Sequence, residues 1–119
     1  MLTSDPVRRF RKLGVATADG NALISAGAGN LLGLVLTVGA TARYYKVYDK
    51  ATAPASTDTP IMTIYVPAGG TVVVTLAEVG LPFALGLGIR ASALGPDADT
   101  TYTSFAAGDS SVTALYQLK

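Results

Sequence analysis

The sequence contains no cysteine and no histidine among its 119 residues. The absence of cysteine excludes disulfides, thiolate ligands for zinc and thiol nucleophiles. The absence of histidine excludes every catalytic triad or metal site that depends on an imidazole. Charged residues make up only 14% of the chain and the formal net charge is +1, so the molecule as a whole does not have the charge of a polyanion binder.

Carboxylates are also scarce, since Glu78 is the only glutamate and most of the aspartates stand beside Gly, Pro, Ser, Thr or Ala. Aspartate in such contexts favours turns, because its short side chain bonds to nearby backbone N–H groups. We therefore expect no enzymatic activity and no cofactor. Asp97 and Asp99 form the one D-x-D pair that suits a hard cation such as calcium, but the rest of an EF-hand pattern is absent. We interpret that segment as a loop.

The hydrophobic pattern predicts β structure. Half of the chain is apolar, which excludes an intrinsically disordered chain and provides the core of one compact domain. Segments rich in Val, Ile, Tyr, Leu and Thr are separated by Gly- and Pro-containing turns, and none shows sustained helical spacing. The expected strands are 14–17, 22–25, 30–38, 43–49, 61–66, 71–76, 83–92 and 112–118. We predict an all-β fold with little helix, a two-layer antiparallel β-sandwich of jelly-roll-like type over residues 21–119.

Residues 1–20 differ from the rest and are predicted to form an extended N-terminal arm. Four of the nine basic residues of the chain lie there within five positions: Arg8, Arg9, Arg11 and Lys12. Such a cluster suits contact with an acidic protein surface or with nucleic acid, and it is also typical of a solubilising terminus. We favour a protein-contacting arm, because the remainder of the chain is not basic.

Positions 20–42 carry no charged residue, and these 23 positions are long enough to span a bilayer as a helix. Five glycines and several Asn, Ser and Thr residues interrupt the run, and its second half has the composition of a β-strand. The preceding basic region is followed by Asp19 instead of a continuous apolar segment, which argues against a secretory signal. We therefore interpret this stretch as strands of the sandwich.

Alternation in segment 43–49 assigns its side chains to two faces. Tyr45 and Val47 share one side and are expected in the core, whereas Tyr44, Lys46 and Tyr48 share the other. Because tyrosine combines apolar area with a polar tip, Tyr44 and Tyr48 around Lys46 suit an exposed protein-contact patch. Stacking of nucleotide bases and an ordinary place in the sheet are the two alternatives.

A second alternating segment covers positions 83–90. The large residues are expected to face the core, and they are Phe83, Leu85, Leu87 and Ile89. The opposite face is small, with Gly86 and Gly88 at its centre. Glycine in a strand often marks the close approach of another backbone, which here is either a loop or arm of the same chain or a neighbouring subunit.

Segment 71–76 is apolar on both faces at its centre. That pattern predicts a strand covered on both sides or one buried at an interface. A domain of this size also leaves sheet edges and apolar surface to protect, and association with identical copies or with a larger lattice protects both.

Four segments together form a wider pattern. They are a Gly/Ala-rich entry to a long strand (25–34), a strand ending in aromatic-Asp before a Pro loop (44–54), a strand running into Val-Pro (64–67) and a Gly-rich strand around an aromatic residue (80–89). In this pattern, residues 24–118 resemble a loose group of small β-sandwich virion proteins of tailed bacteriophages. The basic residues of the arm are not part of the shared pattern.

The resemblance implies a non-enzymatic component of the virion, most commonly a decoration (cement) protein of the outer capsid or a component of the tail or head surface. Our hypothesis is a capsid decoration protein that binds the outer shell and stabilises contacts between major capsid subunits. The expected partners are the major capsid protein and further copies of the chain, as a dimer or trimer. From the composition discussed above we expect no membrane and no direct nucleic-acid contact. The implied location is the capsid surface of the virion, after assembly in the bacterial cytoplasm.

Three alternatives stay open at this point. A tail or head–tail component would differ from a shell protein in copy number. A glycan-binding surface module is disfavoured by the absence of tryptophan and by tyrosines that do not cluster with Asp or Asn in one loop. A small membrane protein would use residues 20–42 as its span.

Overall fold

The computed structural model describes residues 6–13, 21–55, 57–76, 80–92 and 111–119. These ranges contain nine β-strands and no helix, and so no helix of the described residues is long and apolar enough to cross a membrane. The strands are β1 (Arg8–Leu13), β2 (Asn21–Ala26), β3 (Gly29–Thr37), β4 (Arg43–Asp49), β5 (Met62–Val66), β6 (Thr71–Thr75), β7 (Leu81–Phe83), β8 (Gly86–Ser92) and β9 (Ser111–Leu118).

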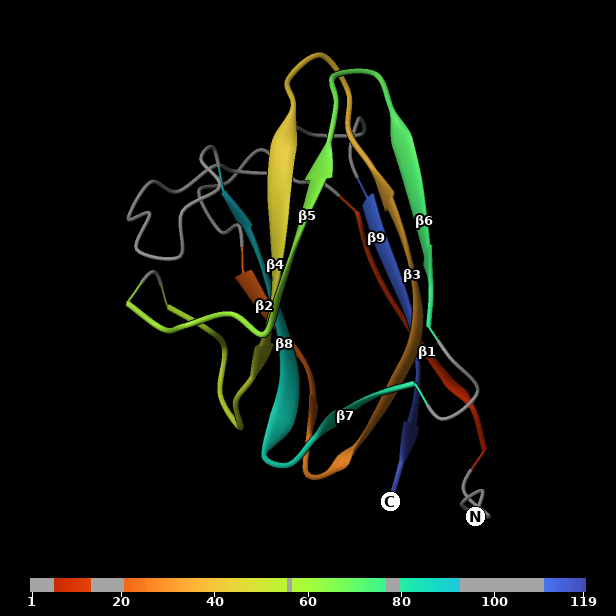
Figure 1. The fold of residues 1–119 in the computed structure, drawn as a ribbon, viewed down its shortest axis with the longest axis vertical. Coiled ribbons are helices and arrows are strands. Elements are labelled where there is room, and N and C mark those ends of the chain that lie inside the picture. The colour runs from red at the N-terminus through yellow and green to blue at the C-terminus, as the bar shows by residue number, and fades with distance from the viewer. Residues whose placement is uncertain (1–5, 14–20, 56, 77–79, 93–110) are drawn as a thin grey trace.

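The strands form two antiparallel sheets that pack face to face (Figure 1). The five-stranded sheet has the order β1-β9-β3-β6, with β7 also paired to β3, and the four-stranded sheet has the order β2-β8-β4-β5. Four strand pairs are nested in the sequence, each pair flanking the previous one, and they alternate between the two sheets. From the innermost to the outermost they are β4·β5, β3·β6, β2·β8 and β1·β9. This nesting is a long hairpin folded over on itself, the topology of a jelly roll, and the predicted two-layer sandwich is confirmed.

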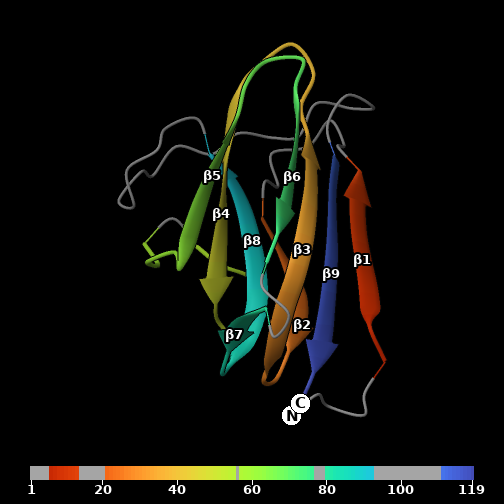
Figure 2. The same cartoon turned by 45° about the vertical axis from the view of Figure 1, so that its right-hand side comes forward.

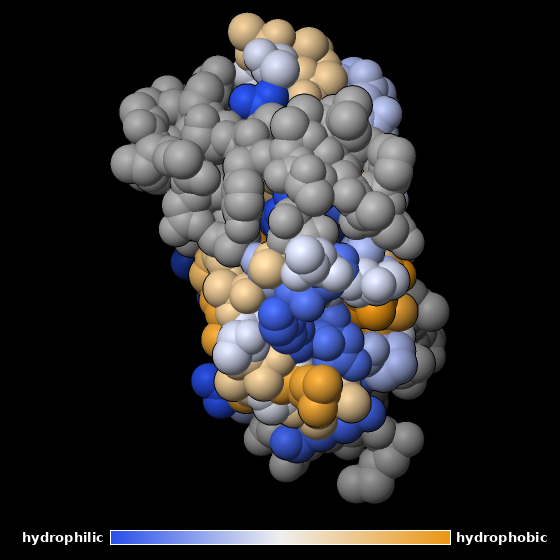
Figure 3. All heavy atoms as spheres, turned by 90° about the vertical axis from the view of Figure 1, so that its left-hand side faces the viewer, coloured by the Kyte–Doolittle hydropathy of each residue, from blue (hydrophilic) through white to orange (hydrophobic). Residues whose placement is uncertain are grey.

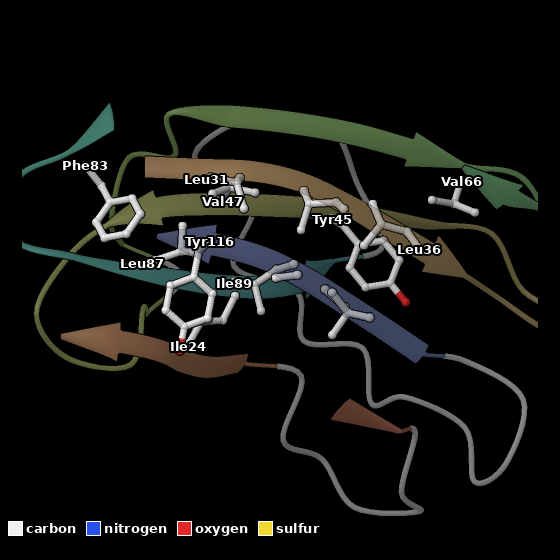
Figure 4. Close-up of a cluster of buried hydrophobic side chains, with 14 of the residues drawn as sticks. Ile24, Leu31, Leu36, Tyr45, Val47, Val66, Phe83, Leu87, Ile89 and Tyr116 are labelled. Carbon is white, nitrogen blue, oxygen red and sulfur yellow. The ribbon is translucent and has the colours of Figure 1, made fainter. Parts of the chain in front are cut away.

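The core lies between the sheets and is made by alternate residues of the strands (Figure 4). Tyr45 and Val47 of β4 are buried there, as predicted, together with Leu31 and Leu36 of β3 (Figure 4). The hydroxyl of Tyr45 donates a hydrogen bond to the Thr37 carbonyl at 3.1 Å, so its polar end is satisfied. Each large apolar side chain buried in this way stabilises the fold by roughly 1.5–3 kcal/mol.

The segment expected as one strand over 83–92 is divided into β7 and β8 by a turn at Ala84 and Leu85. The carboxylate of Asp49 accepts hydrogen bonds from the backbone N–H groups of Ala84 (2.9 Å), Leu85 (2.8 Å) and Gly86 (3.3 Å). The turn therefore interrupts the alternation. Phe83, Leu87 and Ile89 lie in the core, but the expectation for Leu85 is wrong, because its side chain is exposed.

The N-terminal prediction also needs correction. Residues 8–13, expected in an extended arm, form β1 and pair with β9 along the edge of the five-stranded sheet (Figure 2). Phe10 lies opposite Ala114 and packs against the core, whereas Arg8 and Arg9 are exposed. One inward-facing aromatic residue thus supplies the burial that attaches this basic segment to the sheet. The strand expected at 14–17 lies outside the described residues.

Candidate functional site

The outer face of the four-stranded sheet carries the predicted tyrosine–lysine patch. Lys46 and Tyr48 are fully buried, and so is Arg90, which lies directly opposite Lys46 on β8. The expectation that Lys46 and Tyr48 form an exposed contact surface is therefore wrong. Tyr44 is half-buried, and its ring lies 5.0 Å from the ring of Tyr65 on β5 in a tilted arrangement.

The two glycines of this face explain part of its burial. A Cβ atom at Gly86 would lie 2.3 Å from the Lys50 carbonyl oxygen, and one at Gly88 would lie 2.9 Å from the ring of Pro54. The segment after β4 therefore packs directly on β8, at positions where only glycine leaves room. Of the two alternatives for Gly86 and Gly88, packing under a loop of the same chain is the one observed.

That covering segment is fixed by Asp58. Its carboxylate accepts hydrogen bonds from the Ala55 N–H group at 2.7 Å and from the Lys50 ammonium group at 2.6 Å. The backbone bond from Ala55 is the main cause that lowers the pKa of Asp58, followed by the bond from Lys50. Asp49 shows the same behaviour, because the Ala84 N–H group, with Leu85 and Gly86, lowers the pKa of its carboxyl. The prediction that aspartates bind nearby backbone N–H groups in turns is confirmed for Asp58. Asp49 lies in β4 and binds a turn that is distant in the sequence, which the local pattern did not predict.

Seen from this side, the described residues present hydrophilic and hydrophobic groups in a mixed surface, without one dominant apolar area (Figure 3). Among these residues, no group of three or more acidic side chains is placed to hold a metal ion. Asp97 and Asp99, the pair considered for a cation, and the longer loop around them are not among the residues that the structure describes.

The basic residues predicted as protein contacts lie on β1, at one edge of the five-stranded sheet. Arg8 and Arg9 are exposed, and the register places Arg11 and Lys12 opposite Thr113 and Val112 of β9. Charges on an edge strand oppose the addition of a further strand. This edge is therefore protected, and its charge suits an acidic surface.

The outer face of the five-stranded sheet contrasts with that edge. Val35, Val73 and Leu115 on the neighbouring strands β3, β6 and β9 are 38%, 66% and 42% exposed. Together with Leu32 they surround an open hollow at Gly33, whose missing side chain lowers the surface between Leu115 of β9 and Thr75 of β6. We call Leu32, Val35, Val73 and Leu115 the outer apolar patch.

Only part of this patch has a signal in the sequence. The two-faced apolar pattern of 71–76 indicates Val73, and its exposure shows that β6 is not covered on both sides by the described chain. For Leu32, Val35 and Leu115 we predict no contact role from the sequence. The same signal, apolar residues on both faces of one strand, is present in 31–36 and would have identified Leu32 and Val35.

Comparisons with known proteins give no relative: no family model, no curated protein and no solved structure matches this chain.

Proposed function

We propose that this protein is a capsid decoration protein of a tailed bacteriophage, which binds the outer shell and stabilises contacts between major capsid subunits. The observation that supports the proposal best is the outer apolar patch on the outer face of the five-stranded sheet. Neighbouring apolar side chains exposed on one sheet face form a surface suited to contact with another protein, and large patches of this kind typically mark such contacts. The sequence resemblance to phage virion proteins gives that contact its proposed partner.

In this proposal, the outer apolar patch lies against apolar groups at the boundary between two capsid subunits. Burial of apolar area contributes about 25 cal/mol per Å², so three half-exposed side chains contribute only about 1 kcal/mol each. That amount is small for one copy, but the same contact repeats at every equivalent position of the shell. Stabilisation by a bound ligand grows with its occupancy, so the resistance of the shell to rupture by heat rises as the sites fill.

The basic edge is adjacent to this contact. Arg9 lies opposite Leu115 in the register of β1 and β9, so its position adjoins the outer apolar patch. A positive group at the rim of an apolar contact favours an acidic partner and accelerates encounter more than it adds affinity. We therefore propose an acidic margin around the apolar site on the shell.

The experiment is electron microscopy of virions produced with and without the gene for this protein, together with a heat-stability assay of the same virions. We expect a repeating density on the outer shell that disappears in the deletion, and particles that rupture at lower temperature without it. Density for the chain at only a few to dozens of sites in the tail or neck would instead identify a tail or head–tail component. Particles that contain no copies would overturn the virion assignment altogether.

A further inference from the structure

We infer that two copies of this chain pair through β6, antiparallel and centred on Val73, so that their five-stranded sheets join across a two-fold axis. The inference is independent of the proposed function, because it concerns only the contact of the chain with itself. It depends on three properties of β6: an open edge, an uncharged sequence and a palindromic order of residues.

The edge of β6 is open. β6 runs along the border of the five-stranded sheet (Figure 1), and within the described ranges its only strand partner is β3. The side chains of Thr71, Val73 and Thr75 are exposed. An edge strand of this kind presents a row of backbone donors and acceptors that favours pairing with another strand.

The hydrogen bonds at the two ends of β6 show which residues supply that row. Val38 N–H donates to the Gly70 carbonyl at 3.1 Å, and Leu76 N–H donates to the Leu32 carbonyl at 3.2 Å. Because hydrogen-bonded pairs alternate along an antiparallel ladder, the even-numbered residues of β6 bond to β3. Thr71, Val73 and Thr75 therefore direct their N–H and C=O groups away from β3, toward the open edge.

The sequence of β6 is Thr-Val-Val-Val-Thr, which has the same order in both directions. An antiparallel pair centred on Val73 places Val73 opposite Val73 of the second copy and Thr71 opposite its Thr75. In this register every outward backbone group faces a complementary group, as a two-fold interface requires. Threonine–threonine and valine–valine pairs are also favourable neighbours across strands.

The side chains are compatible with this pairing on both faces. Val72 and Val74 lie at the margin of the core. In the proposed pair, Val72 of one copy lies opposite Val74 of the other, so that the two cores extend toward each other. On the outer face Val73 meets its own copy, which joins the two outer apolar patches into one surface. The sequence has no charged residue from position 59 to position 77, so neither β6 nor the neighbouring edge strand β5 brings like charges together.

Charge substitutions at Val73 test the two-fold register. In analytical ultracentrifugation, we expect the unmodified chain to form dimers within a concentration range that extends to about 1 mM. Val73→Lys and Val73→Glu each place like charges opposite one another, and we expect each dissociation constant to rise at least about tenfold. An equal mixture of the two variants should restore dimers. In the proposed register, position 73 of one copy faces position 73 of the other, so the mixed dimer brings a positive charge against a negative one.

Val35→Lys is the matched control, because it adds the same charge to the outer face but one strand away from the edge. We expect it to remain dimeric, and thermal unfolding should show that all three variants are folded. The inference is overturned if the unmodified chain is monomeric throughout this range, if Val73→Lys dimerises as well as Val35→Lys does, or if the mixture does not restore dimers. None of these outcomes involves shell binding, so failure here is distinguishable from failure of the proposed function.

Discussion

The two outer faces of this sandwich reverse the usual relation between polarity and burial. On the four-stranded sheet, Lys46 and Arg90 are charged and yet completely buried. On the five-stranded sheet, Val35, Val73 and Leu115 are apolar and yet open to solvent. Burial of charge costs free energy unless the group is well bonded, and an apolar side chain gains free energy when it is removed from water.

The difference indicates which outer face is covered by segments of the same chain and which is available to a partner. On the four-stranded sheet, the segment after β4 packs on β8 at Gly86 and Gly88 and is fixed by Asp58, whereas Tyr65 on the edge strand β5 is exposed. Nothing in the described residues covers the outer apolar patch. We therefore expect substitutions on the first face to act on folding, and substitutions on the second face to act on association.

The largest expected effect compares two glycines, one on each outer face. In Gly86→Ala the new Cβ atom would lie 2.3 Å from a backbone carbonyl, so the covering segment must move, and we expect a loss of about 3 kcal/mol in unfolding free energy. In Gly33→Ala the nearest atom is the Val74 carbonyl oxygen at 3.1 Å on an open face, and we expect a change below about 1 kcal/mol. Urea unfolding measures both, and equal losses would contradict the comparison.

A smaller difference in unfolding free energy is expected between Lys46→Ala and Val73→Ala, which truncate a charged and an apolar side chain to the same residue. Lys46→Ala removes a fully buried side chain and should lower the unfolding free energy by at least about 2 kcal/mol. Val73→Ala removes an exposed side chain and should lower it by less than about 1 kcal/mol. If truncation of the valine cost more than truncation of the lysine, the assignment of covered and open faces would be wrong.

The Asp49 carboxylate, which holds the turn between β7 and β8, should give a smaller and pH-dependent effect. Asp49→Asn weakens three backbone hydrogen bonds, and we expect a loss of about 1–2 kcal/mol at pH 7. Because the pKa of folded Asp49 lies below its ordinary value of 3.8, its contribution is complete above that value and is lost as the pH falls through the folded-state pKa. Unfolding curves of both proteins should therefore converge in that acidic range. A difference that does not change with pH would contradict this role.

The sequence was sufficient to predict the two-layer fold and most strands, because strands with one buried face alternate visibly. It failed at Leu85, where a carboxylate 36 positions away fixes a turn that local alternation does not show. It failed at Lys46 and Tyr48 for a related reason. Alternation tells which residues share a face, but the segment that covers a face comes from elsewhere in the chain.

The basic N-terminal segment illustrates the same limit. Clustered charge in 8–12 is typical of a solvated arm, and a single inward-facing residue, Phe10, was not enough to indicate a strand. The pairing of β1 with β9 joins residues about a hundred positions apart, and no local pattern specifies such a partner. The open apolar face was indicated only at 71–76, where both sides of the strand are apolar.

The proposed function is tested most directly by binding to shells assembled from the proposed partner, a major capsid protein, without this chain. Val35→Lys places a charge in the outer apolar patch, whereas Ala51→Lys places the same charge on an exposed residue after β4, near the covered face. The account predicts that Val35→Lys weakens shell binding at least about tenfold and that Ala51→Lys binds like the unmodified protein. Equal binding by all three proteins, or a loss confined to Ala51→Lys, would contradict it.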